Sequence, residues 1–307
     1  MINSHLFRVA VATAAACTLA VFVPFEAATG AAGHQGTNPR QRQVYVGVVD
    51  QAGAPVTDLA TADFSIREDG VAREVLRVEP ATDPIEVALL VDNSAAMAQA
   101  NSDVRVALGA FVQALNPRNP IALITFAERP TILLNYALDR SQVTKAVERI
   151  FPIEGSGTML LAAIVEAAKG VEKRGAGRAA IVVITGEGQE FSDLQYESVV
   201  GAIKACGAAF HAEVITNTGG RTMDDGGRNR GLTLDRGSSI SGGRYRTLLS
   251  SMAVAGELKS LAAELNNQYR LVYARPESLI PPEKLEVSTK RPGLTVRATP
   301  AKVRPGS

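Results

Sequence analysis

From residue 85 onwards, short apolar runs alternate with stretches of helical periodicity. Residues 85–91 form a β-branched apolar run bounded by turn residues, which is typical of a buried central strand. Similar runs follow at 121–126, 131–136, 179–185, 210–216 and 269–273. Between the runs, apolar residues recur every three or four positions, as at Val104, Leu108, Phe111 and Leu115. The alternation predicts an α/β fold over residues 84–275, with a doubly wound, mostly parallel sheet and helices on both faces.

The two ends of this region have the pattern of antiparallel strands. In residues 43–80, valines alternate with other residues near the start, and Asp69-Gly70 is a strong hairpin signal. Residues 276–307 contain a second predicted hairpin, turning at Pro292-Gly293, and a tail. Neither group has enough strands to bury an apolar face alone. We therefore expect both to pack together as one small antiparallel β-unit, with the α/β domain inserted between them.

One segment interrupts the α/β pattern. Residues 217–246 hold eight glycines and six arginines and show no apolar periodicity. We expect a long surface loop there.

The N-terminus has the order of a secretory signal. Arg8 precedes an apolar run at 9–23, and small residues follow at 27–33, which predicts a signal peptide over 1–32 and a linker over 33–42. A retained anchor helix is the rival interpretation, but the run is shorter than the ~20 apolar residues of a membrane span. Lipidation at Cys17 is another, but apolar residues continue past this cysteine. The sequence thus predicts export, periplasmic or secreted, with no stable membrane span after cleavage.

Charge and cysteine content exclude several partners. The 32 basic and 31 acidic residues nearly balance, and aromatic residues make up 5% with no tryptophan, so nucleic acid is not an expected partner. After signal cleavage Cys206 would be the remaining cysteine, which excludes an internal disulfide and a cysteine-based metal cluster.

Two polar side chains follow the first central strand. Asp92 and Ser94 stand directly after the run at 85–91. Ligand sites in open α/β sheets lie at this carboxyl end of the strands. A carboxylate and a hydroxyl are oxygen ligands suited to Mg²⁺, Mn²⁺ or Ca²⁺.

This stretch resembles the start of a von Willebrand factor A domain, whose metal-ion-dependent adhesion site opens with Asp-x-Ser-x-Ser. The resemblance extends to the segment 56–70, the Gly-Ser-Gly-Thr ending at Thr158, and the stretch 264–273. With these segments the chain resembles the acidobacterial-type members of the family. It implies metal ligands at Asp92, Ser94 and Thr158. Ala96 replaces the second serine of the motif, and Gly186 stands where the family places a further aspartate.

These two replacements predict that the metal site is degenerate. One carboxylate and two hydroxyls leave a divalent ion mostly hydrated, so we expect no cofactor, or a weakly bound divalent cation. Glu187 and Ser156 are the residues that could supply further oxygens. Glu190 is interpreted with Glu187 as solvated surface charge.

Other chemistry finds no support in the sequence. The three histidines are widely separated, and neither a nucleophile elbow nor a phosphate-binding loop is present. We therefore predict a non-enzymatic binding protein that mediates protein–protein interaction or adhesion. The alternative is a structural or assembly component of the cell envelope with an inert site. The sequence does not identify the partner.

Overall fold

A six-stranded sheet forms the centre of the inserted domain. The computed structural model describes residues 41–216, 224–275 and 282–300. The strands lie in the order β10-β9-β8-β5-β6-β7. All neighbours are parallel except the antiparallel edge pair β6 and β7. Their bounds are β5 Glu86–Val91, β6 Ile121–Thr125, β7 Thr131–Ala137, β8 Ala179–Thr185, β9 Ala209–Ile215 and β10 Tyr245–Leu248. The predicted doubly wound α/β fold is confirmed.

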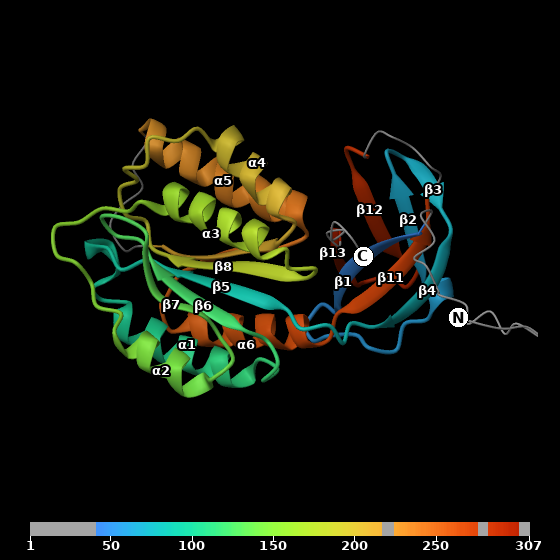
Figure 1. Cartoon of the computed structure of the whole chain (residues 1–307), viewed down its shortest axis with the longest axis horizontal. Coiled ribbons are helices and arrows are strands. Elements are labelled where there is room, and N and C mark those ends of the chain that lie inside the picture. The colour runs from blue at the N-terminus through green and yellow to red at the C-terminus, as the bar shows by residue number, and fades with distance from the viewer. Residues whose placement is uncertain (1–40, 217–223, 276–281, 301–307) are drawn as a thin grey trace, which may run out of the picture. The chain divides into compact units, whose positions relative to one another are not determined.

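Three helices cover each face of this sheet (Figure 1). One layer holds α1 (Asn101–Ala114), α2 (Arg140–Glu148) and α6 (Ala253–Asn266); the other holds α3 (Leu160–Arg174), α4 (Tyr196–Cys206) and α5 (Asp225–Ser241). Side chains alternate between the faces of a strand, so Leu89 of β5 packs in the first core and Leu90 in the second. Both are fully buried, which explains why β5 is apolar on both faces after its first residue, Glu86.

The chain ends form two antiparallel sheets rather than one. The four-stranded sheet has the order β13-β1-β11-β4 and the three-stranded sheet the order β12-β2-β3. The bounds are β1 Gln41–Val49, β2 Phe64–Glu68, β3 Val71–Arg73, β4 Val75–Pro80, β11 Tyr269–Ala274, β12 Leu285–Thr289 and β13 Thr295–Pro300. N-terminal and C-terminal strands therefore do pair, as predicted, and they share a core around Val46, Ile66 and Leu271.

Two details of this β-unit differ from the sequence prediction. The turn before β13 exists, with Gly293 at φ 76°, but β12 pairs with β2 and β13 with β1, so the segment is not a hairpin. The strand predicted to close the α/β sheet, β11, lies instead between β1 and β4. A short apolar run after a helix does not show which sheet the strand joins, because β11 is as apolar as a strand of the α/β sheet at most of its positions.

The prediction of a loop over 217–246 was wrong for most of its length. Asp225–Ser241 is helix α5 and Tyr245–Leu248 is strand β10; residues 217–223 lie outside the described part. The buried face of α5 has helical spacing, but its members are largely polar or small: Asn229, Arg230, Thr233, Leu234, Gly237, Ser238 and Ser241. Apolar periodicity is absent because close packing here uses small residues. A Cβ on Gly237 would lie 2.7 Å from Ile203 Cδ1.

The predicted signal peptide at 1–32 lies outside the described residues, as does most of the predicted linker. Residues 41 and 42 of that linker already belong to β1. Among the described helices, none combines the length and apolar character needed to cross a membrane.

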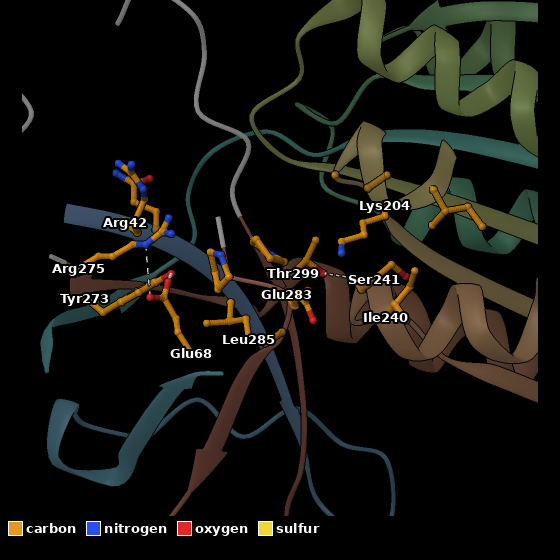
Figure 2. A pocket seen from close by; sticks show the side chains of 17 residues that line it. Arg42, Glu68, Lys204, Ile240, Ser241, Tyr273, Arg275, Glu283, Leu285 and Thr299 are labelled. Carbon is orange, nitrogen blue, oxygen red and sulfur yellow. Dashed lines mark hydrogen bonds and ion pairs between the residues drawn. The ribbon is translucent and has the colours of Figure 1, made fainter. Parts of the chain in front are cut away.

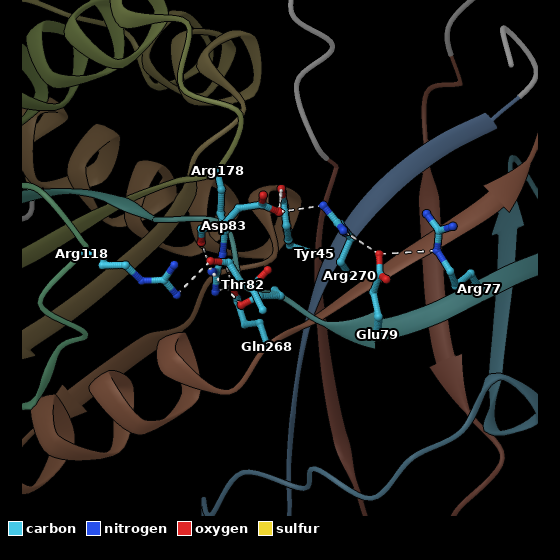
Figure 3. A network of polar contacts seen from close by, with 10 residues as sticks. Tyr45, Arg77, Glu79, Thr82, Asp83, Arg118, Arg178, Gln268 and Arg270 are labelled. Atoms are coloured by element: carbon cyan, nitrogen blue, oxygen red, sulfur yellow. Dashed lines mark hydrogen bonds and ion pairs between the residues drawn. The ribbon is translucent and has the colours of Figure 1, made fainter. Parts of the chain in front are cut away.

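Arg178 ties together the two segments that connect the α/β domain to the β-unit (Figure 3). Its guanidinium donates to the carbonyl of Asp83 at 2.7 Å on one segment. It also donates to Gln268 Oε1 at 2.7 Å and to the carbonyl of Leu265 at 2.7 Å near the other. Burial lowers the pKa of Arg178 to about 10, so the side chain stays charged at neutral pH. One side chain thus satisfies buried acceptors from both connections.

We expect Arg178→Met to lower the free energy of unfolding by about 2–4 kcal/mol, because several buried acceptors lose their donor. Urea unfolding monitored by circular dichroism measures this loss. Arg118→Met is the matched control, since Arg118 makes one exposed hydrogen bond to the same connection, at Thr82, and should cost below ~0.5 kcal/mol. Equal losses in the two variants would contradict the role given to Arg178.

A second buried polar cluster lies where β9 and β10 meet α6. Glu213 and Arg244 form an ion pair with 2.8 Å between Oε1 and Nη2, and Arg244 donates to the carbonyl of Glu257 at 2.5 Å. Burial raises the pKa of Glu213 to about 7. For His211, burial and then the charges of Arg244 and Arg297 hold the pKa well below its usual value. The cluster therefore links stability to pH.

The Glu213 carboxyl retains its proton in the folded state over a pH range in which the unfolded chain has released it, from 4.5 to about 7. Its contribution to the free energy of unfolding is thus present at low pH and is lost as pH rises through this window. Glutamine does not titrate, so the free energy of unfolding of Glu213→Gln minus that of the unsubstituted protein should increase by about 1–3 kcal/mol between pH 4.5 and 7. Taking the difference cancels the opposite contribution of His211. A difference in urea midpoints that stays constant with pH would refute this linkage.

Candidate functional site

The candidate site lies where the strands of the parallel sheet end. Asp92 and Ser94 follow β5 directly, and Thr158 lies on the loop before α3. All three are buried, at 1%, 0% and 0% exposed. A Cβ placed on Gly188 would lie 3.1 Å from Thr158 Cγ2 and 3.3 Å from Ser94 Oγ. The structure thus gathers the side chains that the sequence singled out around one point.

Donors from the protein already surround Asp92. Its Oδ1 accepts from the backbone N–H of Ser94 at 2.8 Å. Its Oδ2 accepts from Thr185 Oγ1 at 2.7 Å and from the N–H of Gly186 at 3.2 Å. The carboxylate therefore fastens the loop after β5 to the end of β8. Ser94 Oγ, in contrast, is buried without a hydrogen-bond partner among the described residues.

Thr158 is held by a carboxylate that sequence reasoning placed in solvent. Glu190 is 4% exposed, and its Oε2 accepts from Thr158 Oγ1 at 3.0 Å and from the N–H of Leu160 at 3.1 Å. Its Oε1 accepts from the N–H of Ser192 at 2.9 Å. Burial raises the pKa of Glu190 despite these bonds. The interpretation of Glu190 as surface charge was wrong, because the carboxylate satisfies the first turn of α3.

The loop after β8 closes over the site. Thr158 N–H donates to the carbonyl of Gln189 at 2.7 Å, and Phe191 N–H donates back to the carbonyl of Thr158 at 2.8 Å. A Cβ on Gly188 would also approach Ala96 Cβ to 3.3 Å. Ala96, one of the two positions at which this chain departs from the motif, therefore lies close against the backbone of Gly188.

A buried guanidinium from helix α5 also belongs to the site, and the sequence analysis did not predict it. Arg230, on α5, is 8% exposed. It donates to Thr185 Oγ1 at 3.0 Å and to the carbonyl of Gly186. Burial lowers the pKa of Arg230, while the charges of Asp92 and Glu190 raise it. A helix in this segment could have been predicted from the four-residue spacing of small and polar residues between the caps Asp224 and Gly242. These residues are Asn229, Thr233, Gly237 and Ser241.

These residues do not form the oxygen shell that a divalent cation needs. Mg²⁺ takes six oxygens, usually one or two carboxylates with several waters, and Ca²⁺ takes six to eight. Here Asp92 is engaged by three donors, and a guanidinium lies against its partners Thr185 and Gly186. Of the two residues considered as extra ligands, Ser156 donates its hydroxyl to the carbonyl of Ile153 at 2.7 Å. Glu187 lines a small cavity with Arg230.

Apolar side chains are exposed on the loops around this closed site. We call five of them the apolar rim: Phe151, Ile153, Phe191, Leu249 and Met252. Leu249 and Met252 are 82% and 78% exposed. The loop that carries Phe151 is fixed to the strand end, because Asn93 Nδ2 donates to its carbonyl at 3.2 Å.

A second hollow lies between the ends of α4 and α5 and the β-unit (Figure 2). This cavity of about 320 Å³ is lined by residues that include Arg42, Lys204, Tyr273 and Glu283. At its margin Glu68 is buried and accepts a hydrogen bond from Tyr273 Oη at 2.8 Å. Among the described residues its lining holds no histidine or cysteine, and its charges are of both signs.

Comparison with known proteins identifies one family. Residues 87–189 match the family model described as the von Willebrand factor type A domain. No curated protein matches the chain.

Several solved structures resemble the chain at low sequence identity. A von Willebrand factor type A protein from Catenulispora acidiphila is 12% identical with a TM-score of 0.48, covering 87% of this chain and 74% of that one. An aerotolerance-related membrane protein from Bacteroides fragilis is 22% identical with a TM-score of 0.44, covering 59% and 98%. The vWF domain of a type V pili tip protein from Porphyromonas gingivalis is 12% identical with a TM-score of 0.47, covering 61% and 96%.

The geometry of the site generates a prediction about metal. We expect millimolar Mg²⁺, Mn²⁺ or Ca²⁺ to change the free energy of unfolding by less than ~1 kcal/mol, because a ligand stabilises the folded state only when it is well above its Kd. Thermal unfolding with each ion and with EDTA measures the effect. A tight ion detected by calorimetry, and lost in Asp92→Ala, would contradict it.

Proposed function

The domain that contains residues 87–189 is a von Willebrand factor type A domain, and from this premise we propose that the chain is an exported binding protein that contacts a protein partner without a bridging metal ion. Domains of this family mediate protein interactions and are generally not enzymes. The proposal rests on the apolar rim around a site whose two carboxylates, Asp92 and Glu190, are already hydrogen-bonded within the protein.

The apolar rim has the character of an interaction surface. Exposed large apolar side chains on neighbouring loops are costly in water unless a partner covers them, and aromatic residues and methionine are enriched in protein interfaces. Phe151, Phe191 and Leu249 come from three different loops, each at the carboxyl edge of the sheet. A partner that contacts all three would cover Asp92 and Ser94, which lie buried beneath.

A catalytic role has less support. Asp92 and Glu190 are both engaged by backbone and hydroxyl donors, so neither is placed as a general base. His211 is buried on β9 and belongs to the cluster with Glu213 and Arg244, away from Asp92. The described residues contain no group of three histidine, cysteine or acidic side chains suited to a metal.

Export is proposed from the sequence. The apolar run at 9–23 followed by small residues is typical of a cleaved signal. We propose a mature chain that starts between about Ala31 and Gly36, in the periplasm or outside the cell.

A structural role in the cell envelope is the second candidate, favoured by the exposed side chain of Val71 on β3, at the edge of the three-stranded sheet. An unpaired strand edge is able to accept a strand from another protein. In that case the β-unit would make the contact and the apolar rim would not.

Affinity capture from the exported fraction separates these proposals. The bait variant Phe151→Ser/Phe191→Ser/Leu249→Ser should lose the partner captured by the unsubstituted bait, because burial of three large apolar side chains is removed. The control Leu138→Ser also removes an exposed leucine, but at the end of β7, on the opposite edge of the sheet, and should retain it.

The same capture with EDTA should recover the same partner in the same amount. Loss of the partner with EDTA would contradict metal-independent binding. Retention by the triple variant together with loss in Val71→Glu would favour the structural role instead.

A further inference from the structure

We propose that Arg230 takes the place of the metal ion in this domain: its guanidinium is a built-in cation that compensates the buried carboxylate at the end of β5 and fixes the loops around it. This inference goes beyond the proposed function, because it concerns the charge balance of the site and is independent of which partner binds. Its tests use the protein alone, so their failure is distinguishable from failure to find a partner.

The first support is the set of contacts that Arg230 shares with Asp92. Thr185 Oγ1 donates to Asp92 Oδ2 at 2.7 Å and accepts from Arg230 Nη2 at 3.0 Å. Gly186 does the same with its backbone, since its N–H donates to Asp92 Oδ2 at 3.2 Å and its carbonyl accepts from Arg230. The Thr185 hydroxyl therefore relays directly between the cation and the carboxylate, and it is polarised in the favourable sense by both bonds. Gly186 contacts both charges through two different peptide groups, its N–H on one side and its carbonyl on the other.

The second support is the balance of buried charge. Asp92 and Glu190 are 1% and 4% exposed, and a buried carboxylate without a compensating charge is strongly destabilising. Both carboxylates act on Arg230 as attractive charges. Thr158 and Ser94, the two hydroxyls that the family motif assigns to a metal, are in the same cluster. The protein thus supplies a positive charge where the motif leads one to expect an ion.

The third support is the way in which α5 is brought to the site. A Cβ on Gly226 would lie 2.6 Å from the carbonyl oxygen of Glu190. Only glycine therefore permits the first turn of α5 to rest against the loop that carries Glu190. Asp224 caps the helix by accepting from the N–H of Gly227 at 2.7 Å. Arg230 follows Gly226 by four residues, on the same face of the helix, so the close approach delivers the guanidinium to Gly186 and Thr185.

Three variants test the proposal by urea unfolding: Arg230→Lys keeps the charge, Arg230→Met keeps most of the volume, and Arg230→Met/Asp92→Asn removes both charges. We expect the unfolding midpoint to fall least in Arg230→Lys and most in Arg230→Met, with part of the loss recovered in the double variant. A double variant that is no more stable than Arg230→Met would overturn the proposal. If Arg230→Met does not fold, a folded double variant supports the proposal and an unfolded one contradicts it.

The second measurement uses Mn²⁺ as a probe. If Arg230 had a purely structural role, its replacement would not change the effect of Mn²⁺ on the melting temperature. Truncating the guanidinium should enlarge the cavity of about 100 Å³ that Arg230 lines and leave the carboxylates uncompensated. We expect Mn²⁺ to raise the melting temperature of Arg230→Met but not of the unsubstituted protein or of the double variant. No response in Arg230→Met, or an equal response in the unsubstituted protein, would show that the guanidinium does not stand in for a cation. Where Arg230→Met is unfolded, refolding on addition of Mn²⁺ is the expected result and its absence contradicts the proposal.

Discussion

A carboxylate buried at the end of the central strand is the constraint on which this end of the domain depends. β5 is apolar on both faces because helices cover both sides of the sheet, so the first polar residue after it, Asp92, starts its loop already 1% exposed. A charge in that position has to be compensated by hydrogen bonds, an ion or an opposite charge. This chain uses hydrogen bonds from three groups, and Arg230 lies behind two of them. The loop after β5 is fastened to the end of β8 by these bonds.

The β-unit has a comparable solution where it joins the α/β domain. The carbonyl of Asp83 on one connection and that of Leu265, in the last turn of α6 before the other, both accept from Arg178. Arg270 of β11 extends the network to Glu79 and Asp83 with N–O distances of 2.7 and 3.0 Å, as Figure 3 shows. Because β11 comes directly after α6 and lies between β1 and β4, the end of the inserted domain is also part of the β-unit. The two parts are therefore joined through arginine side chains and through the short connection from α6 to β11.

The sequence was sufficient for the parts of the fold that depend on apolar periodicity. The central strands, five of the six α-helices in the described part of the chain and the pairing of N-terminal with C-terminal strands all follow from patterns of buried side chains. The order of strands in the β-unit does not, because β11 and β12 show the same alternation whichever sheet receives them. Helix α5 was missed for a different reason. Its buried face consists mainly of polar and small residues that satisfy one another and pack closely, so a search for apolar spacing finds nothing.

In the candidate site, too, some residues were predicted from the sequence and others were not. Asp92, Ser94 and Thr158 were located from the motif, and the structure gathers them. Glu190 and Arg230 were not located, because a buried charge is visible only when its partners are known, and those partners come from β8, α3 and α5. The absence of an expected aspartate at Gly186 pointed to a weakened metal site. In its place Arg230 brings a positive charge next to this position, since the carbonyl of Gly186 accepts a hydrogen bond from the guanidinium.

If Arg230 rather than a metal ion neutralises the site, crystals of the unsubstituted protein soaked in Mn²⁺ should show no anomalous scattering there. We expect no anomalous peak among Asp92, Ser94 and Thr158, with density for the Arg230 guanidinium on Thr185 and Gly186. An anomalous peak coordinated by Asp92 and Thr158 oxygens, with Arg230 displaced, would contradict this role of Arg230.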